Sequence, residues 1–258
     1  MATALARGCV QSELVAAKQV LAADPSEEAR QRFVEQVPGA RTTNDNGQVL
    51  DKADIVVLAV KPQQMTDVLA DIAGRVGTRH LLVSIAAGVT LAKLADGLPR
   101  GVRLVRVMPN TPCLVGLGAC CYSRSAAAGE DDGQLVQRLL ESVGRAYEVE
   151  EKMLDAVTGL SGSGPAFIYG VIEALAEGGS LMGLPKALAV ELAALTARGA
   201  AEMVLATGCS PAELRDQVTS PGGTTLAGLD ALEKLGGVKS LRAAVEAAAK
   251  RSVELGQS

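Results

Sequence analysis

The sequence predicts an α/β fold in which a doubly wound, Rossmann-like sheet that lacks its first strand is followed by an all-α domain. Apolar runs alternate with helical patterns in the first part of the chain, as is typical of strands buried on both faces of a parallel sheet. The runs cover residues 54–60, 80–85 and 104–108, and the helical patterns cover 65–73 and 90–98. From about Leu154 onward the strand signals stop.

The second part of the chain consists of Ala/Leu-rich helical patterns, at 164–182, 185–207, 226–235 and 237–255. Their apolar faces are too broad for a small monomeric bundle to bury, so we expect a second subunit to cover them. The sequence therefore predicts two domains, an α/β domain over 1–152 and a helical dimerisation domain over 153–258. A homodimer through the C-terminal helices, and a higher homo-oligomer built from it, are further expectations.

The chain begins with a helical pattern rather than a strand. Residues 2–12 form the first predicted helix, a short strand is predicted at 18–23, and the turn Asp24–Ser26 caps a charged helix over 27–35. A doubly wound fold normally begins with a strand and a G-x-G-x-x turn, which brings the pyrophosphate of a dinucleotide to the first helix. Neither precedes the first helix here.

Two consequences are expected from the absence of this strand and turn. The neighbouring strands, near Val20 and Ile55, lose hydrogen-bond partners and leave open sheet edges. The pyrophosphate loses backbone donors, although the N-terminus of the first helix and the α-amino charge substitute in part. We therefore expect a truncated, alternatively spliced or mis-started form with weak cofactor affinity.

Composition and charge exclude several classes of function. The 258 residues carry a formal net charge of −4, only 2% are aromatic, and no basic run is present, which argues against nucleic-acid binding. Five cysteines without CxxC spacing and a single histidine, His80, predict no metal site, and we interpret His80 as structural or surface. No apolar run reaches membrane-spanning length, and residues 1–16 lack the features of a signal peptide. A cytoplasmic location is expected, with a mitochondrial one as the alternative.

The segment TSPGGTT (219–225) carries the most specific chemistry, and it leads into an apolar helical pattern. Hydroxyl groups flank the Pro-Gly-Gly turn, and backbone N–H groups at the start of the helix are free to face a ligand. This segment is therefore a suitable receptor for a small carboxylate. An ordinary helix start capped by Ser or Thr is the alternative interpretation.

Three segments resemble one family. VTSPGGTTLAGLDALE (218–233) resembles the signature segment of the pyrroline-5-carboxylate reductases, TGLSGSGPAF (158–167) is similar to the segment that opens their C-terminal domain, and VMPNTP (107–112) is similar to their loop beside the cofactor. The resemblance covers nearly the whole chain and fails only at the N-terminus. It implies the reduction of 1-pyrroline-5-carboxylate to L-proline, the last step of proline synthesis, by hydride transfer from NADPH or NADH.

The resemblance also assigns the substrate site. Ser220 and the backbone N–H groups of Gly223 to Thr225 are expected to hold the carboxylate, and the Thr225 hydroxyl to hydrogen-bond the ring nitrogen. Ser220 and Thr225 are thus the expected catalytic residues. The expected substrate-binding residues are Val218, Ser220, Gly222, Gly223, Thr224 and Thr225.

The cofactor site is expected at the carboxyl ends of the parallel strands, where such sheets bind ligands. The resemblance places the nicotinamide near 59–62 and Asn110, and the adenosine near Asn46. At the adenine ribose, Asp24 favours NADH whereas Ser26 and Arg30 favour NADPH, and a turn and helix cap is the alternative role for this segment. The expected cofactor-binding residues are Asp24, Ser26, Asn46, Ala59, Val60, Lys61, Pro62 and Asn110.

Two other functions stay open. One is a truncated, non-catalytic subunit that oligomerises with or regulates a full-length homologue, because the glycine-rich turn is absent. The other is a dehydrogenase of the β-hydroxyacid type, which has a similar domain order and a catalytic lysine in its helical domain. Lys186 stands at a predicted helix start, but no lysine–asparagine motif accompanies it.

Overall fold

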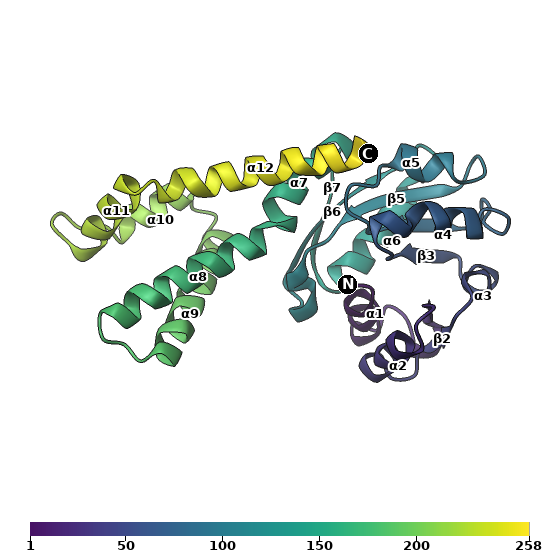
Figure 1. Cartoon of the computed structure of the whole chain (residues 1–258), viewed down its shortest axis with the longest axis horizontal. Helices are drawn as coiled ribbons and strands as arrows, with labels where there is room; N and C mark the ends of the chain where they lie inside the picture. Colours follow the sequence, from purple (N-terminus) through teal and green to yellow (C-terminus); the bar gives the residue numbers. More distant parts are fainter. Residues whose placement is uncertain (258) are drawn as a thin grey trace. The chain divides into compact units, whose positions relative to one another are not determined.

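The computed structural model describes residues 1–257 and divides into two compact units. Unit 1 comprises Met1–Ser163 and the stretch that begins at Ala248, and unit 2 is Gly164–Ala247. Figure 1 gives the labels of the helices and strands. Unit 1 ends later than residue 152, because α7 (Leu154–Val157) and the π-helix η5 (Thr158–Gly162) belong to it, and the Leu154 side chain is fully buried there.

The main sheet of unit 1 has five strands in the order β3-β4-β5-β6-β7. β3 (Ile55–Leu58), β4 (Leu81–Ser84) and β5 (Arg103–Met108) are parallel, as the apolar runs predict. β6 (Gly118–Arg124) runs antiparallel to β5, and β7 (Gly144–Glu148) is parallel to β6. β6 and β7 were not predicted, because GACCYSR and GRAYE contain small and polar residues instead of a continuous apolar run.

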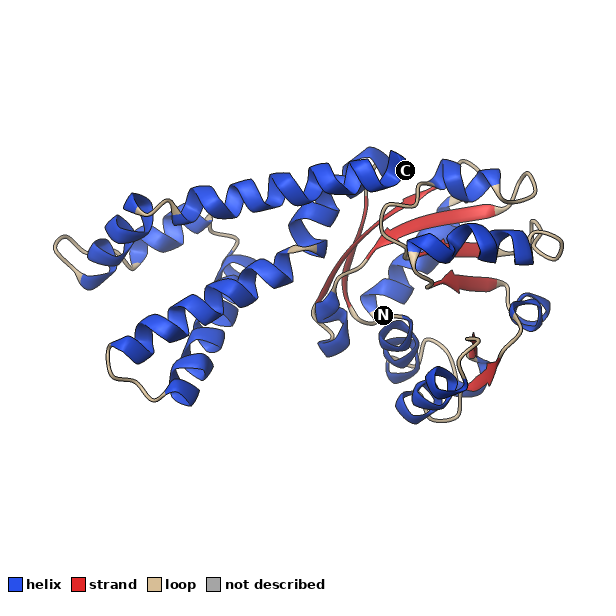
Figure 2. Cartoon of the chain, viewed as in Figure 1, coloured by secondary structure: helices blue, strands red, loops and turns tan. Residues whose placement is uncertain are grey.

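Helices cover both faces of this sheet (Figure 2). Alternate strand residues point to opposite faces: Val83 and Val105 pack on one side, and Leu82 and Leu104 on the other. The first side is covered by α1 (Ala2–Gln11) and α6 (Glu130–Glu141). The second is covered by α3 (Asn46–Lys52), α4 (Met65–Ile72) and α5 (Leu91–Asp96). The predicted doubly wound layer is confirmed.

The sheet is divided where the first strand of a doubly wound fold would lie. β1 (Leu21–Ala23) and β2 (Arg41–Thr43) form a separate parallel pair, with α2 (Glu27–Gln36) beside them. Among residues 1–257 no strand joins β1 to β3, so the predicted loss of partners near Val20 and Ile55 is confirmed. Figure 2 shows the short red pair apart from the larger sheet.

Two details of this region differ from prediction. The strand expected at 18–23 is shorter, because Ala17–Gln19 form a 3-10 turn. The run 54–60 is not buried on both faces throughout, since Ile55 is exposed on β3, the edge strand. A strand without a neighbour on one side leaves its side chains and backbone more accessible to water.

Unit 2 is helical: α8 (Gly164–Leu181), α9 (Lys186–Thr207), α10 (Pro211–Gln217), α11 (Thr224–Lys234) and the first part of α12 (Gly237–Gln257). All but the short α10 were predicted. Its buried cluster consists of Ala176, Ala189 and Ala193, with Ile172 packed against them.

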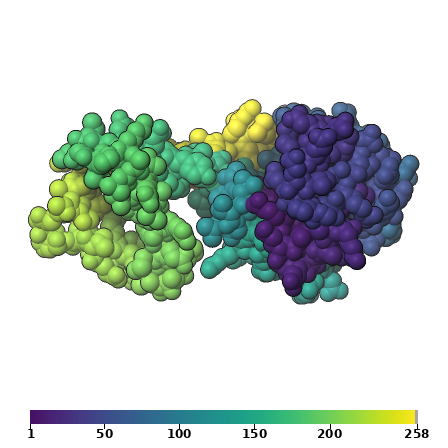
Figure 3. All heavy atoms as spheres, turned by 90° about the horizontal axis from the view of Figure 1, so that it is seen from below, coloured from purple at the N-terminus to yellow at the C-terminus, as the bar shows by residue number. Residues whose placement is uncertain are grey.

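Most large apolar side chains of unit 2 are accessible to water within a single chain. Leu181, Met182 and Leu235 are 81%, 87% and 86% exposed, and the space-filling view shows open gaps among the green helices (Figure 3). An exposed apolar surface of this extent marks an interaction site. None of the helices in residues 1–257 combines the length and the apolar character required to cross a membrane.

Candidate active site

The predicted nicotinamide-side residues lie at one edge of the main sheet. Ala59, Val60, Lys61 and Pro62 follow β3, and Asn110 follows β5, whose carboxyl end lies at the same edge because the strands are parallel. Pro62 begins a 3-10 turn that leads into α4, and the Lys61 side chain is exposed. A ligand at this edge of the sheet would therefore meet main-chain groups and a solvent-exposed lysine rather than a buried charged side chain.

Asn110 is held inside the chain by two hydrogen bonds. The side chain is only 8% exposed. Its Oδ1 accepts from the Ala119 N–H at 2.9 Å, and its Nδ2 donates to the Ser161 carbonyl oxygen at 3.1 Å. The amide thus fixes the loop after β5 to the start of β6 and to η5. Its predicted place beside the nicotinamide stays a prediction.

Two of the three sequence motifs contact each other here. A Cβ on Gly162 would lie 2.3 Å from Cε of Met108, so only a glycine permits this approach without a shift. Gly162 ends the π-helix η5, a type of helix that is frequent at functional sites. Together with the bond from Asn110 to Ser161, this contact joins VMPNTP to the first part of TGLSGSGPAF, residues 158–163, within unit 1.

The predicted adenosine-side residues follow the two short strands. Oδ1 of Asp24 accepts from the Ser26 N–H at 2.8 Å, and Oγ of Ser26 accepts from the Ala29 N–H at 3.3 Å. Arg30 donates to the carbonyl oxygens of Asp24 and Pro25 at 2.6 and 3.0 Å. The structure thus shows the turn and helix cap that the sequence analysis gave as the alternative, and a ribose contact stays a prediction.

Asn46 lies at the start of α3, after β2. Its Nδ2 donates to Oδ2 of Asp71 at 2.9 Å. Asn46 therefore follows a different, two-stranded sheet from the residues 59–62, and the structure leaves its expected role at the adenosine untested.

The predicted substrate segment of unit 2 forms a tight turn. The Gly223 N–H donates to the Ser220 carbonyl oxygen at 3.0 Å, and Gly222 has φ of +71°. Proline at the second position and a glycine with positive φ at the third are the pattern of a type II turn. The turn therefore uses the Gly223 N–H, which was expected to be free for the carboxylate.

The start of α11 is open for a ligand. Gly223 is its N-cap, no side chain caps the helix, and the first-turn N–H groups, beginning with Thr224 and Thr225, have no intrahelical acceptors. Among residues 1–257, the hydroxyls of Ser220, Thr224 and Thr225 have no hydrogen-bond partner, and Val218 is exposed. These groups form a free set of donors for a carboxylate, and a helix capped by Ser or Thr is not what the structure shows.

The comparisons with known proteins identify the family. Residues 151–255 match the family model for pyrroline-5-carboxylate reductase dimerisation, and residues 1–88 match that for NADP oxidoreductase, coenzyme F420-dependent. The mouse protein named pyrroline-5-carboxylate reductase 3 is 46% identical over 99% of this chain and 92% of its own length. The chain belongs to the pyrroline-5-carboxylate reductase family.

Solved reductase structures share the fold over the whole chain. A pyrroline-5-carboxylate reductase from Coxiella burnetii is 34% identical with a TM-score of 0.91, and the alignment covers 100% of this chain and 95% of that one. A pyrroline carboxylate reductase from Plasmodium falciparum, solved with NADP bound, is 33% identical with a TM-score of 0.88 and coverages of 98% and 93%. The resemblance found in the sequence is confirmed, and full-length membership of this family decides against a β-hydroxyacid-type dehydrogenase.

One further loop at the same sheet edge was not predicted from the sequence. The loop between β4 and α5 contains Gly88, with φ of +77°, and the Ala86 N–H donates to Oγ of Ser84 at 3.4 Å. The signal in the sequence that could have identified this loop is its position directly after a parallel strand, the same signal that identified residues 59–62. His80, by contrast, is buried and structural, the first of its two predicted roles. Its Nδ1 accepts from the Gly77 N–H at 2.9 Å, and its Nε2 lies 3.0 Å from the Leu50 carbonyl oxygen.

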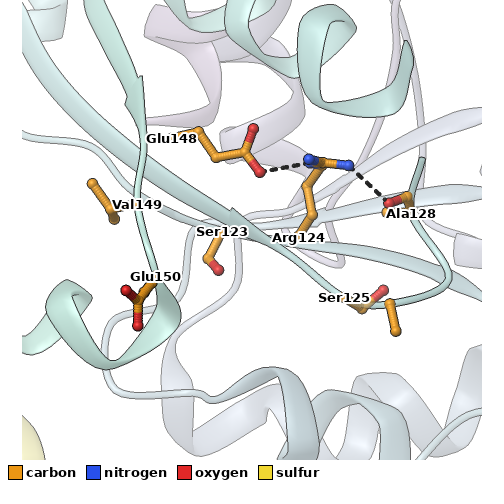
Figure 4. Close-up of a pocket in the computed structure, with 8 residues that line it drawn as sticks. Ser123, Arg124, Ser125, Ala128, Glu148, Val149 and Glu150 are labelled. Atoms are coloured by element: carbon orange, nitrogen blue, oxygen red, sulfur yellow. Dashed lines mark hydrogen bonds and ion pairs between the residues drawn. The ribbon is translucent and has the colours of Figure 1, made fainter. Parts of the chain in front are cut away.

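A hollow of unit 1 lies at the opposite edge of the sheet (Figure 4). It has a volume of about 710 Å³ and is lined by the ends of β6 and β7, where Nε of Arg124 lies 2.7 Å from Oε1 of Glu148. No predicted site residue lines it. Among residues 1–257 no three His, Cys, Asp or Glu side chains are grouped for a metal ion.

Proposed function

We propose that this chain reduces 1-pyrroline-5-carboxylate to L-proline with NADPH or NADH as the hydride donor. Full-length similarity to proteins named pyrroline-5-carboxylate reductase supports the reaction. The observation that carries the proposal is the uncapped start of α11 beside three unpartnered hydroxyls. Its free N–H and hydroxyl groups provide the hydrogen-bond donors that the carboxylate of a small cyclic substrate needs. The segments that we propose for nicotinamide binding and for substrate binding belong to unit 1 and unit 2, respectively.

The substrate carboxylate is held by backbone and hydroxyl donors of the turn. The N–H groups of Thr224 and Thr225 and the positive end of the α11 dipole attract the negative charge. The Ser220 hydroxyl adds a third donor. Gly223 takes part through its conformation, because its own N–H holds the turn closed.

Thr225 orients the imine. Its hydroxyl forms a hydrogen bond with the ring nitrogen and relays a proton to it. The backbone N–H groups of Thr224 and Thr225 hold the carboxylate meanwhile. A protonated imine is already a good hydride acceptor, so positioning supplies most of the rate enhancement.

The residues at the carboxyl edge of the main sheet fit a nicotinamide dinucleotide. Ala59, Lys61 and Pro62 are exposed after β3, which leaves this edge of the sheet open to a flat ring. The first turn of α1 has no side-chain cap, so its N–H groups are available to a pyrophosphate. When bound, the cofactor supplies the hydride.

Substitution of the turn threonines tests the proposal. With purified chain, proline formation from 1-pyrroline-5-carboxylate is expected to fall at least about tenfold in kcat for Thr225→Ala, since a transition-state hydrogen bond is lost. Thr225→Ser keeps the hydroxyl and should keep most of the turnover. Thr224→Ala keeps the backbone N–H but removes one hydroxyl donor to the carboxylate, so it should raise KM and leave kcat nearly unchanged. Wild-type protein that forms no proline with either cofactor supports the non-catalytic alternative, and unchanged kinetics in Thr225→Ala removes Thr225 from the mechanism.

We propose further that unit 2 forms the interface of a homodimer, which assembles into a higher oligomer. The match to a dimerisation family model over 151–255 indicates homo-oligomerisation, and the exposed apolar side chains of α8, α9 and α11 support these helices as the interface. Sedimentation equilibrium should give a mass of at least two chains. A monomer at micromolar concentration contradicts this assignment.

A cytoplasmic location remains our proposal. All five cysteines are free thiols, which suits a reducing compartment. Fractionation of the source cells with an antibody to the chain tests it, and recovery in mitochondria supports the alternative.

A further inference from the structure

Cys113 and Cys120 place two thiols face to face beside the Asn110 loop. Cys113 belongs to the 3-10 turn η3 (Thr111–Val115), and Cys120 to β6. Their Sγ atoms lie 3.6 Å apart, and the residues are 2% and 0% exposed. The segment between the two cysteines is closely packed, since a Cβ on Gly118 would lie 2.3 Å from Sγ of Cys113.

The two thiols differ in acidity because each affects the other. The hydrogen bond from Cys120 lowers the pKa of Cys113 to about 7. The same bond, together with burial, raises the pKa of Cys120. Cys113 is therefore the nucleophile of the pair, since the thiolate is the reactive form of cysteine, and Cys120 is positioned as its resolving partner.

We propose that Cys113 and Cys120 are a reversible thiol-modification site, which a hydroperoxide converts into an intramolecular disulfide. A disulfide requires an S–S distance of about 2.05 Å, so the sulfurs must approach from 3.6 Å. β6 is held by β5 and β7 on its two sides, whereas η3 carries the exposed side chains of Leu114 and Val115. η3 is therefore the segment that moves, and its movement opens the path by which the oxidant reaches the sulfurs.

The oxidation takes place in two balanced steps. The Cys113 thiolate attacks one oxygen of hydrogen peroxide, the O–O bond breaks, and the leaving hydroxide takes a proton to become water, which leaves a sulfenic acid on Cys113. Sγ of Cys120 then attacks that sulfur, the S–O bond breaks, and the Cys120 proton leaves with the hydroxide as a second water. A dithiol reverses the reaction by exchange and is itself oxidised.

The disulfide would alter the loop that follows β5. The Cys113 N–H donates to the Asn110 carbonyl oxygen at 3.1 Å, and the Asn110 side chain holds Ala119, next to Cys120. Movement of η3 therefore shifts the segment expected to lie beside the nicotinamide. An effect on turnover rests on the proposed function, whereas formation of the disulfide does not.

Cys121 provides a matched control. It adjoins Cys120, but neighbouring strand residues point to opposite faces of the sheet. Trypsin cleavage after Arg106 and Arg124 places Cys113, Cys120 and Cys121 in one peptide, 107–124. A link can therefore be measured as the loss of two hydrogens and of two alkylation sites in that peptide.

The experiment treats purified full-length chain with a slight excess of hydrogen peroxide, followed by alkylation and peptide mass spectrometry. Wild type and Cys121→Ser should lose two hydrogens in peptide 107–124 and regain them with dithiothreitol, whereas Cys113→Ser and Cys120→Ala should not. Circular dichroism of each variant confirms that it is folded. A link that survives in Cys120→Ala, or oxygen addition without a link in wild type, overturns the proposal. NAD(P)H titration of the oxidised chain then measures the effect on the cofactor site separately.

Discussion

Gly222 is the residue on which the geometry of the substrate turn depends most. Its φ of +71° lies in the region that side chains with a Cβ rarely adopt. Gly222→Ala should therefore destabilise the turn by about 1 kcal/mol and displace the donors at Thr224 and Thr225. We expect KM for 1-pyrroline-5-carboxylate to rise several-fold in steady-state assays.

Gly228→Ala is the control for this prediction, since Gly228 lies inside α11 and a Cβ there meets no atom of the chain within 4 Å. It should leave KM unchanged and, in a helix interior, stabilise by about 0.5–1 kcal/mol. An unchanged KM in Gly222→Ala would contradict the role of the turn.

Sequence predicted some residues of the site better than others for a physical reason. The Asp24–Ser26 cap could be predicted because its hydrogen bonds span only two or three residues. The bonds of Asn110 could not, because its partners Ala119 and Ser161 become neighbours only after the sheet has formed. The use of the Gly223 N–H within the turn was also missed, since TSPGGTT is compatible with an open or a closed turn.

At the scale of elements, a buried arginine ties β5 to the helices that follow β7. Nη1 of Arg106 lies 3.3 Å from Oε1 of Glu151, and Nη2 lies 3.5 Å from Oδ1 of Asp155. Asp155 also accepts from the Ser252 hydroxyl at 2.7 Å, on the part of α12 that belongs to unit 1. Three parts of the chain that are distant in the sequence, namely β5, residues 151–155 and α12, thus share one polar cluster.

Removal of the arginine should be costly, because it leaves two carboxylates without their cation. For Arg106→Met we expect a loss of about 2–3 kcal/mol, below the value for fully buried pairs because the carboxylates are a quarter to a third exposed. Urea unfolding measures it. Arg124→Met, which breaks the more exposed pair with Glu148, should cost at most about 1 kcal/mol. Equal losses in the two variants would contradict this account.

Strands with a continuous apolar pattern were predicted, and strands without one were not. β4, buried at every position, follows directly from its sequence LLVS. β6 and β7 depend on pairing with β5 and with each other, so tertiary contacts rather than local pattern determine them. The polar cluster of Arg106 was beyond sequence analysis for the same reason.

For the whole molecule, the sequence correctly predicted two parts and the interrupted sheet. The interruption follows from topology, since β1 and β3 would both flank the first strand of a doubly wound fold. The open apolar surface of unit 2 shows that a single chain does not bury all of its core. The homodimer interface that we propose for these helices could not be located from the sequence, because it depends on contacts with a second copy of the chain.

The interrupted sheet leads to a prediction on cofactor affinity. A variant with a strand and a G-x-G-x-x turn fused ahead of Met1 should bind NADPH or NADH at least about tenfold more tightly, because the turn adds backbone hydrogen bonds to a charged pyrophosphate. Fluorescence quenching measures the Kd. A fusion of equal length with valine in place of the glycines is the control. Equal affinity in all three proteins would show that the added turn is not needed.

A crystal structure of the chain with NADPH and proline, or a cyclic analogue of proline, tests the central claim most directly. We expect the carboxylate within hydrogen-bond distance of the N–H groups at Thr224 and Thr225, with the ring nitrogen near the Thr225 hydroxyl. A ligand bound elsewhere, with the start of α11 left empty, would contradict it.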